Sequence, residues 1–216
     1  MSFQRLKERQ RAEREGYTEG LSLRVHRALS WLQRAEQCED NDSRFIFLWI
    51  AFNAAYAFEI DETLRLSEQE SFKLFLEKLS SLDTHKRLDH LIWQEFPGSI
   101  RILLDNQFVF QSFWEYHNGK ITAQQWAERF ADGKRAAQHA LASGNTPLLL
   151  RIVFSRMYTL RNQLIHGGAT WNSSVNREQL RDCVNLLGKL IPLIIELMMD
   201  NPNTLWGDAC YPVVNP

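Results

Sequence analysis

The stretch FIFLWIAFNAAYAF, residues 45–58, decides the fold of this chain. Its side chains recur at helical spacing in two stripes: Phe45, Leu48, Trp49, Phe52 and Tyr56 in one, and Ile46, Ile50, Asn53, Ala54 and Ala57 in the other. A helix that is apolar nearly all round must be covered on both sides. We therefore expect a central helix over about 43–59, capped by Asp42, with either other helices of the chain or a second copy of the protein on its second face.

Helical patterns continue on both sides of this stretch. Upstream, a helix over about 18–38 is joined to the central helix by a short polar break, which predicts an antiparallel pair. Downstream we expect helices over about 67–80, 84–93, 99–116, 122–143, 146–166 and 175–200. Ser67 with Glu70 predicts a capping box, and Thr122 with Gln125 begins a further helix. Pro192 predicts a kink in the last helix.

Composition supports an all-α fold. Leu and Ala total 45 residues whereas Val, Ile and Thr total 27, and no proline precedes Pro97. With 216 residues, the chain is expected to form a single domain, an antiparallel helical bundle. Residues 1–17 are a charged N-terminal arm, either a solvated helix or a loose segment. Residues 61–145 are a helical insertion between two halves of the bundle, and residues 201–216 form an irregular tail.

The charge of the chain is distributed unevenly. The formal net charge is -1, which alone gives no reason to expect a nucleic-acid partner. Between Asp132 and Glu178, however, there is no acidic residue, and this stretch carries six basic ones: Lys134, Arg135, Arg151, Arg156, Arg161 and Arg177. A phosphate-bearing partner is therefore one interpretation. The alternative is that acids from other helices pair with these charges.

The expected helix 146–166 lies in the middle of this basic stretch and carries three of its six basic residues. The boundary signals of this helix are Thr146 as N-cap, Pro147 at the first helical position, and Gly167 and Gly168 after its end. Its apolar stripe is Leu150, Val153, Phe154, Met157, Leu160 and Leu164. Arg161 projects from within that stripe, where a charged side chain is costly without a partner anion. Arg151, Ser155, Asn162 and His166 share a polar face.

The hexapeptide RNQLIH, residues 161–166, resembles the motif of an arginine and a histidine four to six residues apart that marks the HEPN superfamily of helical ribonucleases and toxin-like domains. The motif has the polar residue after the arginine that these proteins favour, and it lies near the end of a long helix that precedes the last one. Residues 45–58 also look like the corresponding helix of the Apea-like branch. The resemblance covers roughly residues 19–60 and 146–200.

The resemblance implies a homodimer in which two copies of the motif face each other across a cleft. It implies metal-independent cleavage of RNA by attack of a ribose 2′-hydroxyl, which leaves a 2′,3′-cyclic phosphate. His166 would transfer protons, Arg161 would neutralise charge on the phosphate, and Asn162 would orient the site. Arg151 and Arg156 on the basic stretch would bind RNA, and Trp171 would stack on a base. A role as a toxin or defence effector, with an antitoxin or defence-system partner, is a further expectation.

A second hypothesis is a non-catalytic dimeric helical module that binds RNA, a nucleotide or a protein. Under this hypothesis Arg161 is expected to lie in an ion pair, and His166 is expected only to cap the end of the helix. We expect no cofactor and no metal: His85 and Asp89 share a helix face, but a solvated charged face explains them better. The apolar stretch 45–58 is too short to span a bilayer, which needs about 20 residues. Three cysteines without a CxxC pair and the lack of a signal sequence predict a cytoplasmic protein.

Overall fold

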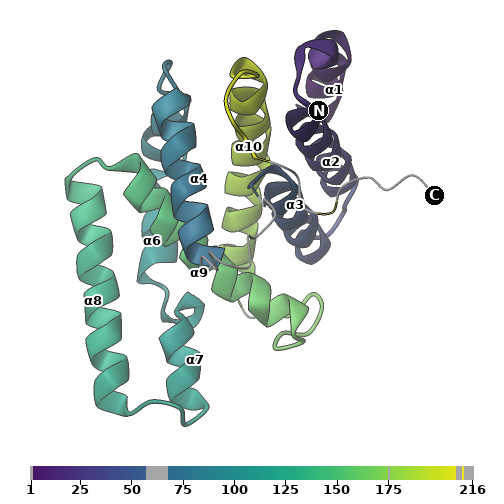
Figure 1. Cartoon of the computed structure of the whole chain (residues 1–216). Coiled ribbons are helices and arrows are strands. Elements are labelled where there is room, and N and C mark those ends of the chain that lie inside the picture. Colours follow the sequence, from purple (N-terminus) through teal and green to yellow (C-terminus); the bar gives the residue numbers. More distant parts are fainter. Residues whose placement is uncertain (1, 57–67, 175, 208–210, 212–216) are drawn as a thin grey trace.

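The computed structural model describes residues 2–56, 68–174, 176–207 and 211, and in these residues every regular element is helical (Figure 1). The predicted all-α helical bundle is confirmed. The α-helices are α1 Ser2–Glu13, α2 Glu19–Glu36, α3 Asn41–Tyr56, α4 Glu68–Leu82, α5 Arg87–His90, α6 Pro97–Asp105, α7 Gln111–His117, α8 Ala123–Ala142, α9 Thr146–Ile165 and α10 Arg177–Asp200. Short 3-10 segments occur at Arg14–Gly16 and Gln107–Val109, and a π-helical turn at Leu91–Glu95.

Helix α3 is the centre of the bundle, as its two apolar stripes predict. It packs against α2 and α10 and also contacts α4 and α9. Trp49 and Phe52 are buried, and the Phe52 ring lies on Phe154 of α9 with the ring centroids 4.3 Å apart. Other helices of the same chain therefore cover α3 on several sides. The expected cap is displaced by two residues: Asp40 accepts a hydrogen bond from the Ser43 backbone N–H at 2.8 Å.

The first helix is a packed element of the bundle. Leu6 is fully buried, and α1 contacts both α2 and α10. At its far end Arg9 forms an ion pair with Asp200 of α10 at 2.8 Å, and Arg5 pairs with Glu196. Residues 2–13 are thus helical, but this helix is packed on the bundle and contributes a side chain to the core, so the expectation of a solvated helix or a loose segment was wrong.

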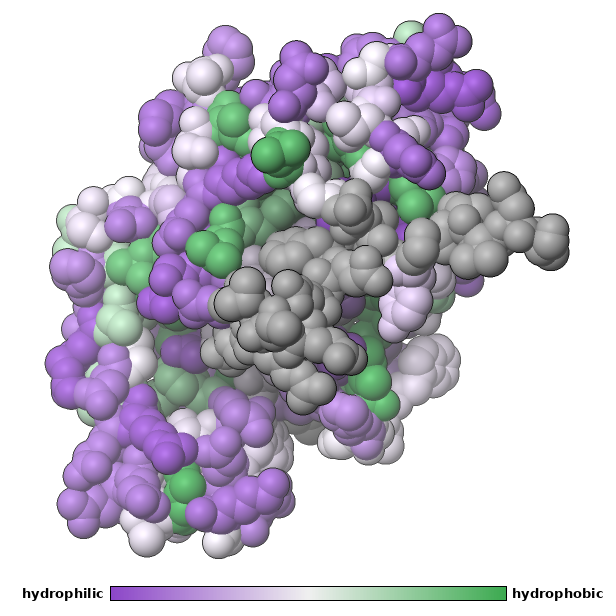
Figure 2. Space-filling view, in the orientation of Figure 1, coloured by the Kyte–Doolittle hydropathy of each residue, from purple (hydrophilic) through white to green (hydrophobic). Residues whose placement is uncertain are grey.

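The segment 61–145 is divided between the core and one edge of the molecule. Helix α4 packs on α9, and its Phe72, Leu76 and Leu79 belong to the same hydrophobic cluster as α3. Helices α7 and α8 lie side by side at the edge opposite α1 and α2 (Figure 1). In the orientation of Figure 2 this edge is mostly hydrophilic. Part of the expected insertion is therefore core structure.

One expected helix is interrupted and another begins late, so the bounds predicted for these two helices were wrong. The expected helix 99–116 is divided into α6, a 3-10 turn and α7, because Asn106 takes an extended backbone conformation and its side chain caps the Phe108 N–H at 2.9 Å. The expected helix 84–93 begins late, at Arg87, after Lys86 in the left-handed region with φ of 54°. The Thr122 and Gln125 capping box is present, whereas Ser67 of the other predicted box lies outside the described residues.

Candidate functional site at the end of α9

Helix α9 begins one residue earlier than its sequence signals indicate. Asn145, not Thr146, is the N-cap: its side chain accepts a hydrogen bond from the Leu148 N–H at 2.9 Å. The Thr146 hydroxyl instead donates to Asp89 Oδ1 at 2.6 Å and accepts from Trp93 Nε1 at 2.8 Å. A partly buried polar network therefore fixes the start of α9 to the segment containing α5.

The apolar stripe of α9 is confirmed, and the helix end also matches the prediction. Five stripe residues are almost fully buried: Leu150, Val153, Phe154, Met157 and Leu160. His166 is the C-cap, and Gly167 follows with φ of 69°, the left-handed conformation that ends many helices. The motif thus lies in the last turn of a helix held firmly by the core.

Three of the six basic residues between Asp132 and Glu178 have acidic partners. The ion pairs are Lys134 with Asp105 at 2.9 Å, Arg135 with Asp132, and Arg177 with Asp42 at 2.5 Å. Arg151, Arg156 and Arg161 form no ion pair with any described carboxylate. The unpaired charges therefore all lie on α9, the helix that carries the motif.

Arg161 is partly buried, and it lies beside Asn162. Its Nη1 donates to Asn162 Oδ1 at 2.9 Å, its Cζ is 5.8 Å from the centroid of the Tyr158 ring, and its buried Nε has no hydrogen-bond partner. An arginine in a structural ion pair would have a carboxylate in this position. The guanidinium is oriented by its neighbours while its charge stays unbalanced within the described chain.

His166 is exposed at the end of the helix. Its backbone N–H donates to Asn162 O at 3.0 Å, but no side-chain hydrogen bond joins its imidazole to another described residue. Residues five apart on a helix point about 140° away from each other. The structure thus joins the side chains of Arg161 and Asn162, and no side-chain interaction joins His166 to either of them.

The three residues expected to bind RNA lie in three different environments. Arg151 is exposed, whereas Arg156 is buried beneath α8 with 8% of its surface accessible. Burial lowers the pKa of Arg156 to about 10, so the guanidinium is still charged at neutral pH. Trp171 is 73% exposed. The pKa of Asp40 is lowered mainly by the hydrogen bond from the Ser43 backbone, with a contribution from the Trp171 side chain, so Trp171 lies close to the start of α3.

A pocket of about 250 Å³ lies beside the motif, and two residues of the motif line it. Trp114 of α7, Gln163 and Leu164 of α9 and Arg177 of α10 contribute to its lining. Gln163 Nε2 also donates to Phe108 O at 2.7 Å, which ties α9 to the 3-10 turn before α7. Sequence reasoning missed this pocket, because its walls come from segments brought together only by the fold.

In the described residues the structure supports neither a metal site at His85 and Asp89 nor a membrane-spanning helix. Asp89 is engaged by the Thr146 hydroxyl and lies 3.8 Å from Lys86 Nζ. Across the described residues, no group of three His, Cys, Asp or Glu side chains is placed to hold a metal ion. No described helix combines the length and apolar character needed to cross a membrane.

No protein-family model, no curated protein and no solved structure matches this chain. The resemblance to the HEPN superfamily accordingly depends on the motif and on the helices around it.

Proposed function

We propose that the protein is a metal-independent endoribonuclease whose site is the last turn of α9. One observation carries the proposal: Arg161 is oriented by Asn162 and has no acidic partner among the described residues, while His166 is exposed one turn further on. A cation held without a counter-ion is suited to an anionic ligand. An exposed histidine nearby can exchange protons with that ligand.

The proposed reaction is an internal transfer at one phosphodiester of RNA. The ribose 2′-oxygen forms a bond to phosphorus as it loses its proton, and the bond from phosphorus to the 5′-oxygen breaks. The 5′-oxygen takes up a proton, and the other product carries a 2′,3′-cyclic phosphate. Imidazole can accept the first proton or supply the second. Arg161 would stabilise the additional negative charge on the phosphoryl oxygens.

Two copies of the chain would complete the site. Within one chain Arg161 and His166 point in different directions, and no interaction joins them. Ile165, beside His166, is 47% exposed, which provides apolar surface for a partner to cover. In a homodimer with α9 ends facing each other, His166 of one copy would act on a phosphate held by Arg161 of the other.

The test is RNA cleavage by the purified full-length protein in EDTA, with the product ends analysed for 2′,3′-cyclic phosphate. His166→Ala should reduce the rate by about 100-fold or more, since general acid–base groups contribute 10² to 10⁴. Arg161→Ala should have a comparable effect. His139→Ala, at an exposed position of α8, is the matched control and should leave the rate unchanged. Absence of cleavage, or equal rates for the His166 and His139 variants, would refute the enzymatic proposal.

The non-catalytic binding module is the second candidate. One observation favours it: the Asn162 side chain is bonded to Arg161, and the His166 imidazole has no described partner to orient it. In that case the protein should bind RNA, a nucleotide or a protein without cutting, and alanine at Arg161 and His166 should leave the binding intact. A role in defence and an antitoxin partner stay predictions from the resemblance.

A further inference from the structure

Arg156 is a buried charge without a counter-ion. It is 8% exposed, forms no ion pair or hydrogen bond with any described residue, and its Nε is fully buried and unsatisfied. Arginines are rarely buried so deeply unless they are paired. Because removal from water is costly for an ion, an unpaired buried guanidinium needs a reason beyond stability.

The surrounding residues hold this guanidinium in one position. Its Cζ lies 3.3 Å from the centroid of the Phe110 ring, so the charged group is stacked on the aromatic face. Helix α8 approaches closely at Gly133, where an added Cβ would lie 2.5 Å from Phe110 Cε1 and 3.2 Å from Arg156 Nη2. The absence of a side chain at Gly133 therefore makes room for the stacked pair.

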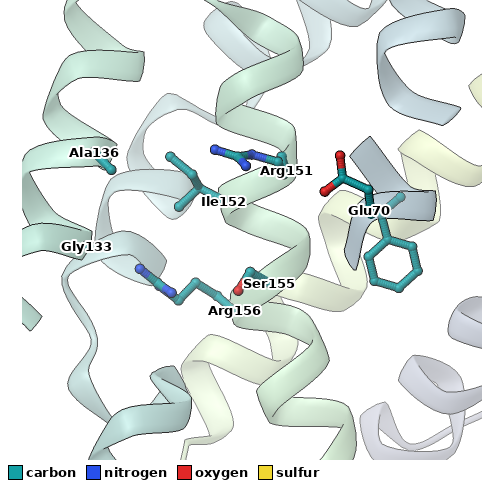
Figure 3. A pocket seen from close by; sticks show the side chains of 8 residues that line it. Glu70, Gly133, Ala136, Arg151, Ile152, Ser155 and Arg156 are labelled. Atoms are coloured by element: carbon teal, nitrogen blue, oxygen red, sulfur yellow. The ribbon is translucent and has the colours of Figure 1, made fainter. Parts of the chain in front are cut away.

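The stacked guanidinium lines a pocket of about 230 Å³ between α4, α8 and α9. Figure 3 shows the side chains of Arg151 and Arg156 extending from α9 toward Ala136 and Gly133 of α8, with Ser155 on α9 next to Arg156. Arg151 is exposed and, like Arg156, has no ion-pair partner in the described chain. Two unbalanced positive charges and one hydroxyl therefore converge on one small cavity.

We propose that this pocket binds a small organic phosphate, that is, a phosphate monoester on a sugar-sized hydroxylated group. Guanidinium groups bind phosphate oxygens through paired hydrogen bonds, and two of them match a phosphate dianion in charge. Ser155 can donate to a third oxygen. Stacking on Phe110 leaves the edge of the Arg156 guanidinium, where its N–H donors lie, for the ligand.

The pocket walls set the size and the polarity of the ligand. Pockets for drug-sized molecules start at about 300 Å³, so a cavity of 230 Å³ suits something smaller. Glu70 lines the pocket from α4, with its carboxylate 3.1 Å from Lys73 Nζ. A carboxylate at this edge disfavours a second phosphate group and can accept a hydrogen bond from a ligand hydroxyl. One phosphate on a hydroxylated carbon skeleton fits both conditions.

This site is separate from the proposed ribonuclease site. Arg156 lies ten positions before His166 and five before Arg161, which corresponds to about 15 Å and about 7.5 Å along the helix axis, and it points into a different pocket. A nucleic-acid strand needs a continuous groove for several nucleotides, whereas here residues of three helices line one cavity of about 230 Å³. The inference therefore does not depend on RNA cleavage, and its test needs no cleavage readout.

The test measures thermal unfolding and calorimetric binding of the full chain with ribose 5-phosphate, inorganic phosphate, ribose, succinate and a short RNA. Ribose 5-phosphate at 100 times its Kd should raise the Tm by about 5–10 °C. Inorganic phosphate should bind more weakly, and ribose and succinate should bind at least tenfold more weakly than the phosphate ester. No shift with either phosphate, equal binding of succinate, or a shift with RNA alone would overturn the proposal.

Arg156→Met keeps an unbranched, flexible side chain that can pack in the core and removes the guanidinium with its charge. It should abolish the ligand-induced shift, and without ligand it should melt at or above the wild-type Tm because an unpaired buried charge is gone. Arg151→Met, at an exposed position that does not challenge folding, should weaken binding about tenfold. Arg101→Met, an exposed arginine on α6 outside the pocket, is the control and should bind as wild type. A large fall in Tm for ligand-free Arg156→Met, or unchanged binding by both pocket variants, would contradict the assignment.

Discussion

Replacing Gly133 by alanine should destabilise the protein, although the same change in a helix interior ordinarily stabilises. Gly133 lies in the middle of α8, where alanine is favoured over glycine by about 1 kcal/mol. Here, however, the new Cβ would lie 2.5 Å from Phe110 Cε1, well inside van der Waals contact. The Phe110 ring also cannot move toward Arg156, because the guanidinium Cζ is 3.3 Å from its centroid.

The expected magnitude follows from these two opposing effects. Overpacking a core position costs about 1–3 kcal/mol, which exceeds the gain in helix propensity and leaves a net loss of about 0–2 kcal/mol. Gly188 in α10 is a matched control, because its added Cβ would meet only Arg44 Nη2 at 3.7 Å. Gly188→Ala should therefore stabilise by about 0.5–1 kcal/mol.

Urea unfolding and thermal melts of the two variants provide the comparison. If each variant lies in the middle of its expected range, the free energies of unfolding of Gly133→Ala and Gly188→Ala should differ by about 2 kcal/mol. For a chain of this size this corresponds to a difference of about 4–8 °C in Tm. Gly133→Ala should also weaken binding in the adjacent pocket, since Phe110 positions Arg156. If both variants raise the Tm equally, the close approach of α8 to Phe110 is not as described.

Two other predictions concern the packing of α1. Leu6→Ala should lower the free energy of unfolding by about 2–5 kcal/mol in urea titrations, because Leu6 is fully buried; a loss under 0.5 kcal/mol would mean that α1 is a loose arm after all. Burial alone would raise the pKa of Asp200, but hydrogen bonds from Arg87 and Arg9 outweigh it, so the pKa is lowered. A carboxyl with a depressed pKa in the folded state stabilises above its unfolded value of about 3.9 and loses that contribution as the pH falls through the folded value. Asp200→Asn should therefore narrow the difference in Tm between neutral pH and about pH 3, and an unchanged difference would contradict this assignment.

Local patterns were sufficient to predict most of the fold. The two stripes of residues 45–58 predict a helix covered all round, and α3 is that helix because its apolar residues leave no polar face for water. The break at Asn106 was missed because its side chain competes with the helix for a backbone N–H, and the surrounding apolar residues fit either structure. Thr146 was misjudged because its hydroxyl finds partners in Asp89 and Trp93, more than fifty residues away.

The candidate sites were less predictable, since they depend on which charges find partners. The sequence identifies six basic residues without a nearby acid, but only the fold separates Arg177, which meets Asp42, from Arg156, which meets no described acid. One local signal does point to the pocket. A glycine inside a helical pattern often marks close packing, and Gly133 is such a residue.

The packing of α1 against α10 has a consequence for the synthesis of the chain. Contacts between α2 and α3 are local, so this pair can form as soon as α3 has left the ribosome. The partners of Arg5 and Arg9, by contrast, are Glu196 and Asp200, and both pairs span 191 residues of the chain. Helix α1 therefore completes its packing only after α10 has been made, and until then the side chains that it presents to α10 stay available to chaperones or to other chains.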